Sequence, residues 1–487
     1  MIPSVRKYLT ISLLLLFITP ACGQRSQVGQ SETPSPAVSQ SADLDKETVI
    51  GEIGNPGVGD RYFPMLGNGG YDVTEYDLQL TWDPNLRFLS GSATIYGTSN
   101  INLLSLNLDL SGMKVLSVSM DDANLQFFVE ENELTVVFPS VLIKNTDFSI
   151  TVDYEGTPGL INDSLFPFEG GWFNSARGVL VAGEPSSSQA WHPVNDHPKD
   201  RAHFNISMTL PSDLSFVTNG VLVSKSSDAK STTWEYETEH EQAPYLTTIA
   251  IGKFSQTFEQ TFDEIQIRHW VEEGVQFPSQ ENLNLETMII IFEELFGPYP
   301  FGDYGILAVN ENLGYALETQ TLSIFGKDLV GNQQIQAHEL AHQWFGNFIT
   351  LDDWSDIWLN EGLATYAEQL YLEKVNPNYN IDESFFEYYY SLSDQGYEFH
   401  VKPRPGDPGP TALFSSSVYI RPAMALHALR LEMGDPLFFQ SLREYVRTFG
   451  GKSATPEGFI ETFEDNANKD LELFFQQWLF EDQLPPR

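Results

Sequence analysis

Two histidines and two glutamates in the second half of the chain have the types and the spacing of a metal site. The segment His338-Glu339-Leu340-Ala341-His342 is followed by Glu361, nineteen positions after the second histidine. On a helix, residues i and i+4 lie on nearly the same face, so both imidazoles can reach one ion. Glu361 would be a third ligand and leave a fourth position open for water, as in catalytic zinc sites. Glu339 lies between the ligands and can act on that water as a general base.

The alternative is an ordinary amphipathic helix whose two histidines have structural roles only, and the neighbouring residues favour the metal site. Apolar residues at 359, 363, 366, 367 and 370 predict a second helix that ends near Asn376-Pro377. Glu361 would lie on or beside its apolar face, where a carboxylate is costly unless it is paired or metal-bound. The histidines would lie on a preceding helix, from about 332 to 347, which Gly346 and Asn347 can end.

Five further stretches accompany this motif and carry a family resemblance. They are Phe296 to Phe301, Gly314 to Thr319, Val418 to Ala423, Pro193 to Pro198 followed by Phe204, and Tyr62 to Val73. Together with the histidine–glutamate spacing, they resemble the gluzincin zinc aminopeptidases of the aminopeptidase N and leukotriene hydrolase type. The resemblance covers roughly residues 61 to 487. It implies one zinc ion per chain, held by His338, His342 and Glu361.

The chain departs from the family pattern at several positions near the substrate. Thr319 stands in place of the asparagine of the family's G-A-M-E-N motif, and Tyr315 stands in place of its first glycine. Arg421 and Pro422 replace the lysine and glycine that follow the family's tyrosine, and the glutamine that often precedes Glu184-Pro185 is absent. These changes concern side-chain preference more than the type of reaction.

The reaction that these residues imply is hydrolysis of a peptide bond by water activated on zinc. Glu339 would take the proton from that water and pass it to the leaving amine. Tyr419 would donate to the oxyanion opposite the zinc. Glu318 would pair with the free α-amine of a peptide, which is largely cationic at neutral pH, and so fix the first peptide bond over the metal. Thr365, one turn beyond Glu361, is a further candidate to hydrogen-bond a ligand.

This mechanism predicts a zinc aminopeptidase that acts on peptides with a free amino terminus. Two other functions stay open at this stage. One is a hydrolase of small non-peptide substrates within the same family, which Glu318 and Tyr419 disfavour. The other is an inactive binding lipoprotein, which the intact ligands and Glu339 disfavour.

The amino-terminal residues indicate export. Arg6 and Lys7 precede an apolar run from Leu9 to Ile18 that is too short to cross a bilayer, and Cys22 is the only cysteine in 487 residues. Residues 1–22 resemble a bacterial lipoprotein signal with a lipidated Cys22, and the alternative is a secretory signal with an incidental cysteine. We therefore expect an extracytoplasmic protein that is lipid-anchored to the cell membrane or otherwise secreted. Residues 23–60, rich in Gln, Ser, Pro and Gly, predict a flexible linker.

The net charge of −41 argues against binding to nucleic acid or direct adhesion to anionic lipid. The favoured explanation of this charge is a solvated acidic surface that aids solubility. Adaptation to salt and attraction of cationic peptides are the alternative explanations.

The patterning of the mature chain predicts an α+β protein with two domains. Apolar and polar residues alternate over 76–82, 148–154 and 204–210, so residues 61–254 should form an antiparallel β-saddle or sandwich domain. Helical patterns at 281–295, 421–433, 437–449 and 470–480 fit the family's thermolysin-like, mainly α catalytic domain over residues 255–487. We expect no C-terminal helical domain, because too few residues follow the last predicted helix.

Overall fold

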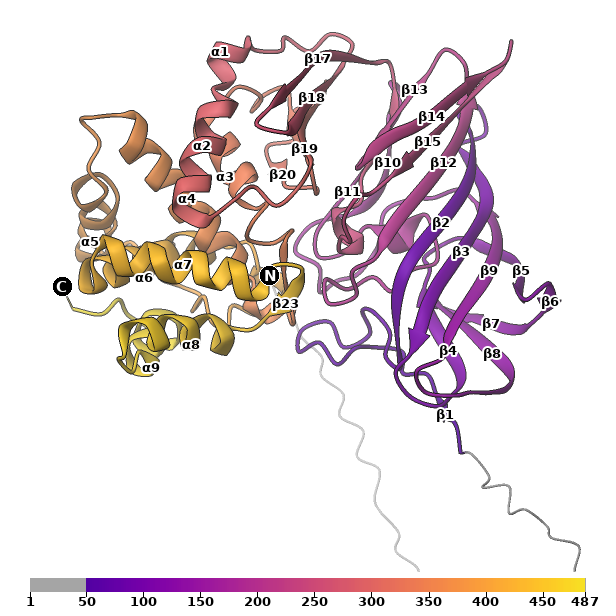
Figure 1. The fold of residues 1–487 in the computed structure, drawn as a ribbon, viewed down its shortest axis with the longest axis horizontal. Coiled ribbons are helices and arrows are strands. Elements are labelled where there is room, and N and C mark those ends of the chain that lie inside the picture. Colours follow the sequence, from indigo (N-terminus) through magenta and orange to yellow (C-terminus); the bar gives the residue numbers. More distant parts are fainter. Residues whose placement is uncertain (1–49, 487) are drawn as a thin grey trace, which may run out of the picture. The chain divides into compact units, whose positions relative to one another are not determined.

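The computed structural model describes residues 50–486, which lie within one compact unit (Figure 1). The predicted leader with Cys22 and the linker up to residue 49 lie outside the described residues. Strands make up the first half of the described chain and helices predominate in the second half (Figure 1). This order is the predicted α+β arrangement of a β domain followed by a mainly helical domain.

The largest sheet of the β domain has the strand order β14-β15-β12-β2-β3-β9-β5-β6. Its strands are β2 (Tyr71–Asp83), β3 (Phe88–Ser99), β5 (Lys114–Met120), β6 (Ala123–Asn124), β9 (Asp147–Gly156), β12 (His203–Pro211), β14 (Val221–Ser227) and β15 (Ser231–Glu237). The predicted strands lie inside β2, β9 and β12 and are confirmed. Neighbouring strands are antiparallel, as predicted, except that β2 and β12 run parallel.

Two smaller sheets complete the β domain. One has the order β1-β4-β8-β7, from Glu52–Ile53, Leu103–Asp109, Glu133–Leu142 and Gln126–Glu130. The other has the order β10-β11-β16-β13, from Gly171–Asn174, Val179–Ala182, Ile249–Gly252 and Ser215–Thr218. The apolar side chains that these sheets bury form the core of this domain. Alternate residues are buried along β2 and β12.

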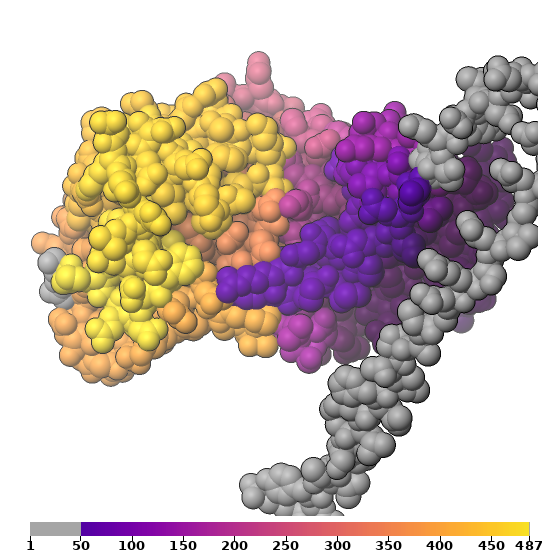
Figure 2. All heavy atoms as spheres, turned by 90° about the horizontal axis from the view of Figure 1, so that it is seen from below, coloured from indigo at the N-terminus to yellow at the C-terminus, as the bar shows by residue number. Residues whose placement is uncertain are grey.

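The prediction of a linker up to residue 60 is wrong at its carboxy-terminal end. β1 pairs with β4, and the buried carboxylate of Asp60 accepts hydrogen bonds from the backbone N–H groups of Phe63 and Trp354. Its Oδ2 also lies 3.1 Å from Nε2 of His197. In Figure 2 an indigo part of the chain reaches across to the orange and yellow carboxy-terminal half. Such tertiary contacts order a segment whose polar composition resembles a linker.

The second half opens with a five-stranded sheet that the sequence patterns did not indicate. Its order is β17-β18-β19-β21-β20, from Phe254–Phe262, Ile265–Glu272, Asp303–Val309, Leu322–Gly326 and Ala316–Leu317. β18, β19 and β21 are parallel and β20 is an antiparallel edge strand. All seven residues of β19 and all five of β21 are buried, which explains the absence of an alternating pattern.

The helices that follow hold the metal-site motif. They are α1 (Gln280–Leu283), α2 (Leu285–Phe296), α3 (Gln333–Ala341), α4 (Trp358–Val375), α5 (Glu387–Asp394), α6 (Ser416–Met433), α7 (Asp435–Phe449), α8 (Pro456–Ala467) and α9 (Glu472–Phe475), with a short pairing of β22 (Ile349–Leu351) and β23 (Lys452–Ala454). The predicted end of α4 at Asn376 is confirmed, because Asn376 is its C-cap. α3 is shorter than predicted, and His342 is its C-cap.

Helix α4 packs against both α3 and α6. α6 begins at Ser416, five residues before the predicted start, so Tyr419 lies in its first turn. Where α4 crosses α6, Gly362 faces Pro422, and a Cβ built on the glycine would lie 2.4 Å from the proline Cβ. The absence of a side chain at Gly362 therefore lets the helix that holds Glu361 approach the helix that holds Tyr419. Within the described residues, no helix has the length and apolar character needed to cross a membrane.

Candidate active site

Three predicted ligands converge between α3 and α4. Nε2 of His338 lies 3.2 Å from Oε2 of Glu361, and Nε2 of His342 lies 3.6 Å from the same oxygen. All three ligand atoms lie within 4.8 Å of one another, and the residues are buried. Among the described residues this is the one such group of His, Cys, Asp and Glu side chains. Two imidazoles and one carboxylate at this separation match the protein ligand set of a catalytic zinc site.

The second nitrogen of each histidine is held by an acceptor. Nδ1 of His338 lies 2.7 Å from Oε1 of Glu368, and Nδ1 of His342 lies 3.0 Å from the carbonyl oxygen of Phe345. Each acceptor requires a proton on Nδ1, which leaves a lone pair on Nε2. Since both Nε2 atoms face Glu361, the site has the histidine tautomers that a metal ion needs.

Glu339 and Tyr419 line the same cavity of about 660 Å³. Burial raises the pKa of the Glu339 carboxyl to about 8, while the neighbouring His338 and His342 act in the opposite direction. A bound cation would lower this raised pKa and favour the carboxylate that a general base requires. The ring of Tyr419 stacks on that of His338, with centroids 5.9 Å apart. Burial raises the pKa of the Tyr419 hydroxyl well above its ordinary value, so this group remains a donor at neutral pH.

Two further carboxylates face the cavity. Glu318 follows the edge strand β20, and Glu184 follows β11 of the β domain. They are 3% and 8% exposed, and the Oε1 atom of each has no hydrogen-bond partner. Burial and the charge of Glu318 raise the pKa of Glu184 well above its ordinary value, and burial also raises that of Glu318. Two unpaired carboxylates in one buried space would be stabilised by a cationic ligand.

The backbone of Glu318 is fixed by the turn that follows α3. Nδ2 of Asn347 donates to the Glu318 carbonyl oxygen at 2.7 Å, and Nε2 of Gln343 donates to the same oxygen at 3.1 Å. The histidine motif and the carboxylate on the sheet edge are therefore held by one set of hydrogen bonds. This arrangement keeps Glu318 at a constant position relative to the three ligands.

The sequence matches two protein-family models over most of the folded chain. The Peptidase M1 N-terminal domain matches residues 73–246 and the Peptidase family M1 domain matches residues 281–478. The chain belongs to peptidase family M1. The matched ranges fall within the predicted domains 61–254 and 255–487, whose boundaries stay predictions.

Solved M1 structures share the whole architecture. An M1 zinc metallopeptidase mutant from Deinococcus radiodurans, bound to a Tyr-Ser-Ala substrate, is 30% identical with a TM-score of 0.81. The match covers 88% of this chain and 99% of that chain. Another structure of 30% identity is a two-domain M1 zinc metallopeptidase mutant bound to L-tryptophan, with a TM-score of 0.80.

Curated relatives are more distant and longer. Aminopeptidase M1 of Arabidopsis thaliana is 23% identical over 447 residues, which are 84% of this chain and 50% of that protein. Aminopeptidase N of Oryctolagus cuniculus is 29% identical over 285 residues, which are 53% of this chain and 30% of that protein. The chain spans about half the length of the first curated relatives it matches.

The departures from the M1 pattern have visible structural consequences. The hydroxyl of Thr319 donates to the carbonyl oxygen of Leu322, so it holds the turn between β20 and β21. The buried guanidinium of Arg421 donates to the carbonyl oxygens of Val401, Gln477 and Gln483, so it ties α6 to the carboxy-terminal segment. Neither side chain lines the cavity. Tyr315 does line it and is 42% exposed.

The structure adds Glu368 and Glu184 to the predicted site residues. It shows no hydrogen-bond partner for the predicted Thr365. Glu368 and Glu184 were not predicted as site residues, although Glu368 lies seven positions after Glu361 on the same helix. Thr365 was the predicted hydrogen-bond partner of a ligand, but its hydroxyl is buried without a partner. Glu368 contacts His338 instead. The Glu184-Pro185 pair of the family pattern was the available signal for Glu184, although no local pattern shows that it reaches the site from the other domain.

Proposed function

We propose that the chain is a zinc-dependent aminopeptidase that binds one zinc ion and releases amino-terminal residues from peptides. The observation that carries the proposal is the convergence of Glu318 and Glu184 on the cavity that contains the three metal ligands. A free α-ammonium group is the cation that these two buried carboxylates lack. Related M1 structures bound to Tyr-Ser-Ala, L-tryptophan and L-arginine support peptides and their terminal residues as ligands.

Each residue then has a separate task. Zinc bound by His338, His342 and Glu361 would supply Lewis-acid chemistry, which polarises a carbonyl and makes water ionise near neutral pH. Glu318 and Glu184 pair with the α-ammonium and orient the first peptide bond, which lowers the entropic cost of reaching the transition state.

The proton and the developing charge are handled by two other groups. Glu339 accepts a proton from water as the carbonyl is attacked and returns it to the departing amine. The hydroxyl of Tyr419 donates a hydrogen bond to the carbonyl oxygen as it gains negative charge, and one such donor contributes roughly 10²–10³ in kcat.

A panel of aminoacyl chromogenic amides, with and without a chelator, tests this function. We expect zinc-dependent release of the chromophore that is lost on chelation and restored by added zinc. The N-acetylated amides provide the control, since they lack the ammonium group and should be hydrolysed poorly. A zinc-loaded protein that hydrolyses no amide in the panel would contradict the proposal.

We also propose that the enzyme is exported and anchored through a lipid on Cys22. The support is the basic start, the apolar run of ten residues and the single cysteine that follows them. A lipidated amino-terminal cysteine carries more than one acyl chain, and stable anchoring requires at least two membrane-binding signals. The predicted linker, which contains Ser and Pro, would then separate the acidic enzyme from the membrane surface.

A further inference from the structure

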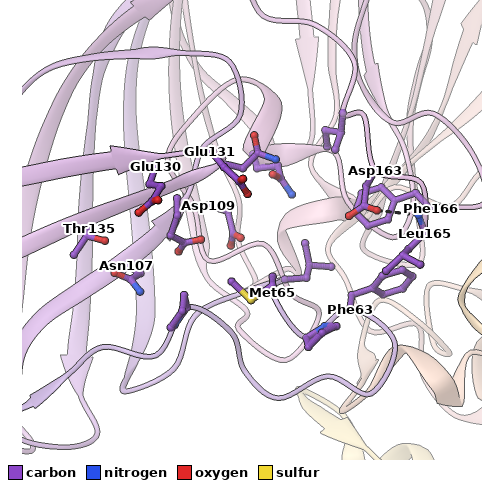
Figure 3. A pocket seen from close by; sticks show the side chains of 17 residues that line it. Phe63, Met65, Asn107, Asp109, Glu130, Glu131, Thr135, Asp163, Leu165 and Phe166 are labelled. Carbon is purple, nitrogen blue, oxygen red and sulfur yellow. Dashed lines mark hydrogen bonds between the residues drawn. The ribbon is translucent and has the colours of Figure 1, made fainter. Parts of the chain in front are cut away.

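The β domain contains a second cavity, of about 600 Å³, that shares no lining residue with the zinc cavity. One side is formed by the sheet β1-β4-β8-β7 and the other side by two loops (Figure 3). The lining residues, all within the described chain, include five carboxylates and no Lys, Arg or His. The carboxylates are Asp109, Glu130, Glu131, Glu133 and Asp163.

Three of these carboxylates form a row across neighbouring strands. Glu133 of β8 is directly opposite Asp109 of β4 on one side and Glu130 of β7 on the other. We call these three residues the carboxylate row. Like charges directly opposite each other destabilise a sheet, so the row has a cost that a bound cation would remove.

The surroundings of the row increase this cost. Burial and the charge of Glu133 raise the pKa of Asp109 well above its ordinary value, and burial raises the pKa of Glu133 to about 7. Asp109 is held in place, because its Oδ2 accepts hydrogen bonds from Nδ2 of Asn68 and from the N–H of Asp196. The row therefore cannot relax by turning Asp109 toward solvent.

Unpartnered oxygens in the same cavity point independently to a hydrogen-bond donor as ligand. Asn107 lies two residues before Asp109, on the same face of β4, and is 4% exposed. Its Oδ1 is buried and has no hydrogen-bond partner, and the same holds for Oε1 of Glu133. Buried oxygens of this kind are rarely left without a donor. A ligand with several N–H groups would satisfy both.

The opposite side of the cavity is mainly apolar, with the carboxylate of Asp163 beside Leu165 and Phe166. Its apolar side chains, which we call the apolar wall, are Phe63, Met65, Leu66, Ile161, Leu165 and Phe166. Figure 3 shows Phe63, Leu165 and Phe166 across the cavity from Asp109 and Glu130, with Met65 drawn between the two groups. Phe63 and Phe166 are in edge-to-face contact, with centroids 5.2 Å apart, so this part of the wall is already packed. Met65 and Leu165 are exposed, which leaves apolar surface at the rim.

A compact metal ion fits this cavity poorly. Among the described residues, no three His, Cys, Asp or Glu ligand atoms other than those of the zinc site lie within 4.8 Å of one another. Four of the five carboxylates and the unpartnered oxygens lie on one side, most of the apolar surface lies on the other, and the volume accommodates whole side chains. The cavity thus matches an organic cation joined to an apolar group.

We propose that this cavity binds an arginine or lysine side chain of a peptide together with an adjacent apolar residue. The guanidinium or ammonium group would lie against the carboxylate row and donate to the unpartnered oxygens. The apolar residue would lie against the apolar wall. This site does not depend on the zinc site, and it gives the chain a second contact with peptides beyond the amino-terminal residue.

Calorimetric titration of the full chain tests the proposal independently of turnover. The probe is N-acetyl-Leu-Arg-Phe-amide, whose blocked ends remove the amine that the zinc cavity would bind. We expect the arginine peptide to bind at least about tenfold more tightly than its citrulline counterpart, which has nearly the same shape without the charge. Glu133→Gln should weaken binding about tenfold, and the exposed Glu237→Gln on β15 should change it less than about twofold.

Four results would overturn the proposal. They are no binding of the arginine peptide at millimolar concentration, equal binding of the citrulline peptide, equal binding to the Glu133→Gln protein, and equally tight binding of spermidine or Ca²⁺. Spermidine would indicate a site for small polyamines, and Ca²⁺ would indicate a metal site. Circular dichroism and thermal unfolding of the Glu133→Gln protein establish that it is folded, since this substitution preserves size and shape.

Discussion

Removal of Glu368 should weaken zinc binding although Glu368 is not a ligand. Its Oε1 lies 2.7 Å from Nδ1 of His338, and the side chain is 15% exposed. This hydrogen bond fixes the tautomer and orientation of the histidine and makes its other nitrogen a stronger ligand. Loss of such a partner typically costs roughly 10–100-fold in metal affinity, or about 1.4–2.8 kcal/mol.

Two substitutions separate the charge from the hydrogen bond. Glu368→Gln keeps an acceptor for His338 and should cost about tenfold in zinc affinity, whereas Glu368→Ala removes both and should cost about 100-fold. Nε2 of Gln334 donates to the other carboxylate oxygen of Glu368 at 2.6 Å, so the glutamine variant keeps its oxygen toward His338 only if the Gln334 amide turns its own oxygen toward the new NH2 group.

Zinc affinity is measured by competition with a chromophoric chelator. The matched control is Glu294→Gln on α2, an exposed glutamate whose partner is Lys374, and its zinc affinity should equal that of the wild type. If both Glu368 variants bind zinc as tightly as this control, the contact with His338 has no role in the metal site and our interpretation of α4 is wrong.

Four further predictions concern the site and the amino terminus. Glu339→Gln should retain zinc by metal analysis and lose about 10²–10⁴ in kcat, so near-normal turnover would exclude it as the base. Glu318→Ala should lower kcat/KM for free-amine substrates and leave that for N-acetylated substrates unchanged, whereas equal loss would indicate a structural role. Gly362→Ala would place a Cβ 2.4 Å from Pro422 and should destabilise the fold by about 1–3 kcal/mol in urea unfolding; unchanged stability would mean that α4 and α6 adjust freely. Cys22→Ser should move the protein from the membrane to the soluble fraction, and identical fractionation of wild type and variant would exclude the anchor.

The metal site was predictable from sequence because its ligands lie on two consecutive helices. The i, i+4 spacing of His338 and His342 and the stripe around Glu361 are local patterns, and local patterns determine which helix face a residue occupies. Glu368 could have been found by the same reasoning, since it lies seven residues, about two helical turns, after Glu361. Its acidic character on the buried side of α4 was the available signal.

Other features depend on tertiary contacts that no local pattern contains. The helix was predicted to continue to about residue 347, because the apolar Trp344 and Phe345 extend its pattern. The structure ends α3 at Ala341, and both aromatic residues pack into the core from the turn that follows. Residues 52–60 are held in place by the pairing of the two-residue strand β1 and by the hydrogen bonds of Asp60. Glu184 reaches the zinc cavity from the segment after strand β11 of the β domain, more than 150 positions before His338 in the sequence.

Mass-spectrometric analysis of a peptide digest tests the central claim most directly. A ten-residue peptide and its N-acetylated form are incubated with the zinc-loaded protein, the chelated protein and the Glu318→Ala protein. We predict that the zinc-loaded enzyme shortens the free peptide stepwise from its amino terminus, that the acetylated peptide stays intact, that chelation stops the shortening, and that Glu318→Ala slows it. Cleavage at internal bonds, or equal degradation of the acetylated peptide, would contradict a zinc aminopeptidase that recognises the free amine through Glu318.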